Sequence, residues 1–225
     1  MSPSPAPLTA AFWRTRRSAA VAGIASAVLL LAAMAMIRLA LGDADPRTLL
    51  LDSHRRSVVR LGLNLVPFAG IAFLWFIGVV REQIAEVEDR LFSTVFLGSG
   101  LLFVALLFQG AVTTTSLVAM AAGQHVEPTL WTYGVGTTHT LVSVYAMRMA
   151  AVFTLSVSTL GLRTSAFPRW VAWLGYAVAL VLLVAAGEHK WTQLVFPLWV
   201  LLLSVVILLT RSASRSGASP APDRG

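Results

Sequence analysis

Six long apolar runs, separated by short polar segments, constrain the fold of this chain more than any other feature. A helix needs about 20 apolar residues to cross roughly 30 Å of hydrocarbon. Only 12% of the residues are charged and the mean hydropathy is +0.78, whereas soluble domains carry about 25% charged residues. We therefore predict an all-α polytopic membrane bundle of six transmembrane helices. The predicted spans are 19–41, 61–80, 91–121, 137–162, 169–187 and 191–209.

Polar segments flank the predicted membrane domain, which covers residues 18–210. The N-terminal segment 1–17 is rich in proline and serine before it becomes basic, and the tail 211–225 is also basic. Both compositions are typical of disorder, because neither can bury enough apolar surface to form a core. The segment 42–60 is the longest polar stretch between two spans, and we expect it to lie at the outer membrane interface.

The basic residues are distributed unevenly between the two sides of the predicted bundle. With a cytoplasmic N-terminus, the inner segments contain ten arginines and the outer segments contain six basic residues. Because arginine and lysine accumulate in cytoplasmic loops, this bias predicts that both termini are cytoplasmic. The basic residues of segment 47–60 are the evidence against this orientation.

Arg148 is an unusual residue for a membrane span. It lies near the middle of the predicted span 137–162, and none of the predicted spans contains an Asp or Glu that could pair with it. Arginine at the centre of a bilayer costs about 2.5–3.5 kcal/mol on insertion scales, so it must face protein, water or a ligand. Its best neutral partner is Gln109, at a similar depth in the preceding span. We predict a polar seam between these two helices, formed by Gln109, Thr113, Ser116, Tyr145 and Arg148.

Three interpretations of this seam are open. Buried polar side chains can simply join two helices, with about 0.6 kcal/mol for each contact. Alternatively, Arg148 can anchor an anionic substrate or a lipid head group, since charges inside membranes often mark functional sites. The long arginine side chain can also extend to a membrane surface, although a central position makes this difficult.

The four histidines all fall on the predicted outer side of the membrane. His125, His139 and His189 are weak candidates for a metal site, together with the carboxylates Glu127 and Glu188. No two of them have the spacing of a helical metal motif such as His-x-x-x-His. The absence of cysteine excludes disulfides and iron–sulfur clusters. We therefore predict no metal, no cofactor and no catalytic residues.

Two stretches resemble a known family. The region from Leu61 to Gly100, with the segment LNLVPFAG, and the loop sequence FPRWVAWLGY are similar to an uncharacterised family of multi-pass bacterial membrane proteins, a domain of unknown function. The resemblance implies a helical bundle in the bacterial cytoplasmic membrane. It implies no activity, ligand or catalytic residue.

Two classes of function fit the sequence. The first is a structural, accessory or partner-binding membrane subunit, which could form a homo-oligomer, because the loops are short and carry no motif. The second is a carrier or binder of a small anionic or amphipathic molecule or a lipid, anchored by Arg148. An enzyme is less favoured, because no acid, base and nucleophile share one depth. The basic residues lie at span ends, where they meet membrane lipid, so we expect no nucleic acid partner.

Overall fold

The computed structural model describes residues 8–41, 52–84, 90–122, 127–164, 167–188 and 191–216, and within these ranges the chain is helical apart from turns. The elements, in chain order, are α1 (Leu8–Leu41), α3 (Ser53–Ile84), α4 (Arg90–Ala122), α5 (Pro128–His139), the π-helix η1 (Thr140–Ala146), α6 (Met147–Thr164), α7 (Arg169–Val184), the 3₁₀ turn η2 (Thr192–Leu194) and α8 (Val195–Ser216).

Five helical segments within the described residues are long and apolar enough to cross a membrane. They are Ala20–Ala40, Ser53–Arg81, Ser93–Ala121, Pro128–Thr164 and Thr192–Leu209. The predicted span 169–187 corresponds to α7, which has 16 residues and is therefore only about 24 Å long. The all-helical prediction is confirmed for the described residues.

Several helices extend beyond the predicted boundaries. The first helix begins at Leu8 and the last ends at Ser216, so both enter segments that we expected to be disordered. Helix α3 begins at Ser53, inside the predicted interfacial segment, of which residues 42–51 lie outside the described ranges. Asp52 explains this start, because its carboxylate accepts hydrogen bonds from the backbone N–H groups of His54 and Arg55 at 2.9 and 3.2 Å.

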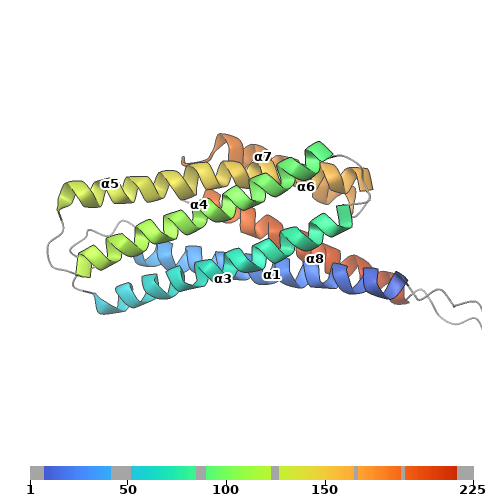
Figure 1. Ribbon diagram of the computed structural model, residues 1–225, viewed down its shortest axis with the longest axis horizontal. Coiled ribbons are helices and arrows are strands. Elements are labelled where there is room, and N and C mark those ends of the chain that lie inside the picture. The colour runs from blue at the N-terminus through green and yellow to red at the C-terminus, as the bar shows by residue number, and fades with distance from the viewer. Residues whose placement is uncertain are drawn as a thin grey trace, which may run out of the picture.

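The long helices run along the longest axis of the molecule (Figure 1), and their contacts form a closed ring. Around the ring, α1 packs against α3, α3 against α4, and α4 against the continuous helix formed by α5, η1 and α6. Helix α6 then packs against α7, α7 against α8, and α8 against α1. Each apolar helix therefore has a helical neighbour on both sides.

A cluster of phenylalanine side chains fills the centre of the helix ring. Phe73 of α3 lies 5.3 Å from Phe103 of α4 and 5.1 Å from Phe153 of α6, measured between ring centroids. Phe196 of α8 contacts the Phe103 ring at 4.8 Å in an edge-to-face arrangement, which aromatic pairs prefer. The four rings are fully buried, so they tie four of the helices to one core.

Small residues allow the helices to approach closely at two places. A Cβ atom on Gly23 would lie 2.1 Å from Ser204 Oγ of α8, and a Cβ atom on Gly175 would lie 2.0 Å from Ser158 Oγ of α6. Both contacts are too short for any side chain larger than glycine. Gly175 begins a step to Ala179, the small-xxx-small pattern typical of membrane helix interfaces.

Candidate functional site

The α7–α8 hairpin is shorter than the other helices of the ring, and this mismatch opens a cavity. In Figure 1 the end of α7 lies part way along the molecule, whereas α3, α4 and α5 continue beyond it. Gly187, in the turn after α7, lies beside Val144 of η1, because a Cβ atom on Gly187 would be 2.9 Å from Val144 Cγ2. The segment η2, which follows this turn, contributes Gln193 to the cavity lining.

The cavity has a volume of about 210 Å³. This exceeds the roughly 150 Å³ of an apolar cavity that can hold benzene. The lining comes from α1, α3, α4, α5, η1 and η2, so the ring closes around it from several sides. Most of the wall is apolar, with Leu30, Ile37, Leu63, Val66 and Leu107 among its residues.

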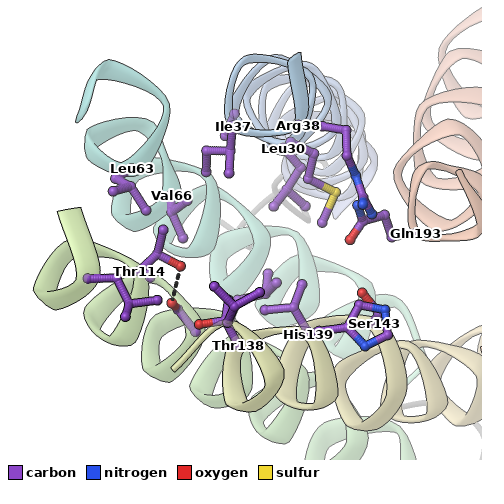
Figure 2. Close-up of a pocket in the computed structure, with 18 residues that line it drawn as sticks. Leu30, Ile37, Arg38, Leu63, Val66, Thr114, Thr138, His139, Ser143 and Gln193 are labelled. Atoms are coloured by element: carbon purple, nitrogen blue, oxygen red, sulfur yellow. Dashed lines mark hydrogen bonds between the residues drawn. The ribbon is translucent and has the colours of Figure 1, made fainter. Parts of the chain in front are cut away.

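Four of the polar side chains lie toward one end of the cavity, whereas Thr114 lies beside Val66 and Thr138 lies between the two groups (Figure 2). Arg38 of α1 and Gln193 of η2 point toward one another there, and His139 and Ser143 lie nearby. Leu63 and Val66 of α3 lie toward the other end. The cavity is therefore amphipathic along its length.

Arg38 and Gln193 are joined by hydrogen bonds. The network orients the Gln193 amide so that its Oε1 atom accepts from Arg38 Nε at 3.0 Å and also from Arg38 Nη2. Both side chains are half-buried. This contact connects the end of α1 to the start of the last membrane helix, at the polar end of the cavity.

Two threonines of the wall differ in how their hydroxyl groups are bonded. Thr114 Oγ1 donates to the backbone carbonyl of Gly110 at 2.8 Å, within its own helix. Thr138 Oγ1 is buried and has no hydrogen-bond partner among the described residues. A buried hydroxyl without a partner costs about 1–3 kcal/mol, so Thr138 is suited to a polar group that enters the cavity.

The π-helix η1 forms part of this wall through Val142 and Ser143. Segments of π-helix are rare, and they occur frequently at functional sites. Gly110 of α4 accommodates this segment, because a Cβ atom there would lie 2.4 Å from Val142 Cγ2. The irregular backbone thus lies at a close contact between α4 and η1.

The residues of the predicted polar seam lie on the outside of the ring rather than between helices. Arg148, Tyr145, Gln109 and Ser116 are exposed, and Thr113 is half-buried. Thr113 Oγ1 and Ser116 Oγ donate to carbonyls of their own helix, at 3.0 and 3.1 Å. Within the described ranges, no hydrogen bond joins Arg148 to Gln109. The expected interhelical contact is therefore not formed inside one chain.

Arg148 lies near the middle of the membrane-length helical segment Pro128–Thr164. Its helix begins at Pro128 rather than Thr137, and the neighbouring hairpin turn lies at Val144. Arg148 follows Val144 by four residues, or about 6 Å along the helix. Exposed Glu188 and Trp191 border this turn on either side. Along its helix, Arg148 thus lies about 6 Å from the level of the turn that follows α7.

The histidine candidates do not form a metal site in the described part of the chain. No group of three or more His, Asp or Glu side chains is close enough there to hold a metal ion. His125 and His189 lie outside the described residues. His139 lines the cavity instead, beside Gln193 and Ser143.

Arg38, Gln193 and Thr138 were missed as site residues by the sequence reasoning. Arg38 was counted there only among the six basic residues of the outer segments, and no motif connects it to Gln193, which lies 155 positions further along the chain. Two features of the sequence could have pointed to this site. One is a basic residue at the end of an apolar run, and the other is the short apolar run that forms α7. No family model, curated protein or solved structure matches this chain.

Proposed function

We propose that this chain is an integral membrane protein that binds a small amphipathic molecule in the cavity between α1, α3, α4 and the α5–η1 helix. The observation that carries the proposal is the amphipathic lining, polar at Arg38 and Gln193 and apolar at Leu63 and Val66. Ligand sites are typically concave and mostly apolar, with a few polar groups that fix orientation. The site is thus centred on Arg38 instead of Arg148.

The membrane arrangement belongs to the same proposal. Five membrane-length helices support a multi-pass protein, and α7 would be the sixth span because it packs between α6 and α8. The arginine bias supports cytoplasmic termini, which would place the cavity in the outer half of the bundle. The cytoplasmic membrane of a bacterium remains the location expected from the family resemblance.

Photolabelling tests this proposal. The purified protein in lipid nanodiscs would be irradiated with two medium-chain probes that carry a diazirine in the chain, one a carboxylic acid and one an alcohol. We expect at least one probe to label α1 or α3 at cavity-lining residues. Labelling should be lost in Ala111→Phe, because Ala111 lines the cavity on α4, and retained in Ala105→Phe, which adds the same bulk to the exposed face of that helix.

Two results would overturn the proposal. One is that neither probe labels cavity-lining residues above the level found for exposed lipid-facing positions. The other is that Ala111→Phe is labelled at the cavity as strongly as Ala105→Phe, provided that both variants unfold at the same temperature.

A second candidate, a partner-binding or accessory membrane subunit, is favoured by the exposed row that contains Arg148, Tyr145 and Gln109. Tyr145 is 53% exposed in the single chain. Polar side chains on a membrane helix are often satisfied by a neighbouring helix, so a second copy or another subunit could cover this row. Crosslinking from Gln109→Cys in the membrane tests it, since a partner there predicts a discrete crosslinked species.

A further inference from the structure

We infer that the head group of the ligand in this cavity is an anionic oxygen group, a carboxylate or a phosphate monoester, and that it binds at Arg38; this inference rests on the proposed function. The charged side chain of the lining is Arg38, and the described lining residues include no Asp or Glu. A guanidinium group stays protonated at any physiological pH. Arg38 therefore brings a permanent positive charge and several N–H donors to the polar end of the cavity.

The geometry of the polar end fits such a head group. Arginine presents several N–H donors in a planar fork that matches carboxylate and phosphate oxygens. Gln193 accepts from Arg38 on one side, which fixes the orientation of the guanidinium plane. An anionic oxygen group accepts hydrogen bonds only, so it complements donors such as Arg38.

The hydroxyl groups of the wall add donors that an anion can use. Ser143 lines the cavity and is 9% exposed. Thr138 Oγ1 is buried without a partner among the described residues. A hydroxyl hydrogen rotates to suit its acceptor, so both can donate to ligand oxygens. Hydrogen bonds to charged groups stabilise more than those between neutral groups.

The volume limits the size of the ligand. The cavity volume of about 210 Å³ is of the same order as the roughly 150 Å³ of a cavity that holds benzene. A short or medium-chain acid, with its chain directed toward Leu63 and Val66, matches this volume better than a whole phospholipid. The probe of choice is therefore octanoate or octyl phosphate.

Competition against the photoreactive acid tests the inference. Octanoate, octyl phosphate, octanol and octylamine have the same chain and different head groups, so their competition for cavity labelling isolates the charge. We expect at least one anion to compete about tenfold or more better than octanol, and octylamine to compete least. Octanoate and octyl phosphate then distinguish a carboxylate from a phosphate.

Variants at Arg38 assign the preference to one side chain. Arg38→Gln should reduce the advantage of the anions over octanol to about threefold or less, whereas Arg38→Lys, which keeps the charge but loses the planar fork, should retain part of it. If Arg38→Gln does not fold, the comparison of competitors in the wild-type protein and in Arg38→Lys remains decisive.

The possible failures are distinguishable. If octanol competes as well as both anions, or octylamine competes best, the anionic head group is wrong while the cavity remains a ligand site. If the anions are preferred equally in Arg38→Gln and the wild type, the assignment to Arg38 is wrong. If no probe labels the cavity, the proposed function itself is wrong.

Discussion

Arg38 Nε donates a hydrogen bond of 3.0 Å to the side-chain oxygen of Gln193, and this contact connects α1 to η2 at the polar end of the cavity. The two residues are 155 positions apart. They meet because the α7–α8 hairpin is short, so η2 lies at the level of Arg38 rather than beyond the end of α1. This contact thus joins the hairpin to α1 at the polar end of the cavity.

Replacement of Gln193 by glutamate should weaken anion binding without loss of the fold. The new carboxylate would face Arg38 in the place of Oε1 and would compete with a ligand anion for the same donors. We expect the concentration of octanoate that halves photolabelling to rise about tenfold or more, and that of octanol to change much less. Thermal unfolding serves as the control, and an unchanged octanoate value would contradict the prediction.

Replacement by alanine should affect the free energy of unfolding differently at two buried serines. Ser26 Oγ donates to the carbonyl of Ala69 at 3.1 Å and so joins α1 to α3. Ser158 Oγ, equally buried, has no partner in the described part of the chain. Ser26→Ala should lower the free energy of unfolding by about 1 kcal/mol, whereas Ser158→Ala should leave it unchanged or raise it. Equal destabilisation, measured by chemical unfolding in mixed micelles, would contradict this difference.

Two glycines of α5 form a matched pair for a packing test. A Cβ atom on Gly134 would lie 2.4 Å from Leu117 Cδ2, while a Cβ atom on Gly136 would meet nothing within 4 Å. Gly134→Ala should lower the free energy of unfolding by about 1–3 kcal/mol through overpacking. Gly136→Ala should be neutral or stabilising, since alanine favours helix by about 1 kcal/mol over glycine. The opposite order would show that α4 and α5 do not pack as described.

Arg148→Gln should change what binds to the outside of the ring rather than its stability. Arg148 is exposed and makes no hydrogen bond with the described residues, so we expect the free energy of unfolding to change by less than about 0.5 kcal/mol. Native mass spectrometry should show the loss of a co-purified anionic lipid or of a partner, and Arg148→Lys should retain it. A large loss of stability with unchanged lipids and partners would instead assign Arg148 a structural role.

The sequence determined the fold class and the approximate position of most helices. Apolar runs long enough to span a bilayer, with few charges inside them, leave a helical bundle as the expected structure, because backbone polar groups in lipid must be satisfied within each segment. Small residues at helical spacing are typical of contacts between membrane helices, and Gly175 does lie against Ser158 of α6. Helix ends were less well defined, since Ser53 and Pro128 start their helices among polar residues.

Only the tertiary structure decided which polar residues share a site. Helical spacing placed Gln109 and Arg148 at similar depths, but the direction in which a side chain faces depends on how the helix is rotated against its neighbours, and both residues face outward. The rotation follows from packing around the phenylalanine core, which a hydropathy pattern cannot resolve. The pairing of Arg38 with Gln193, and the cavity beside it, likewise depends on where the short hairpin ends relative to α1.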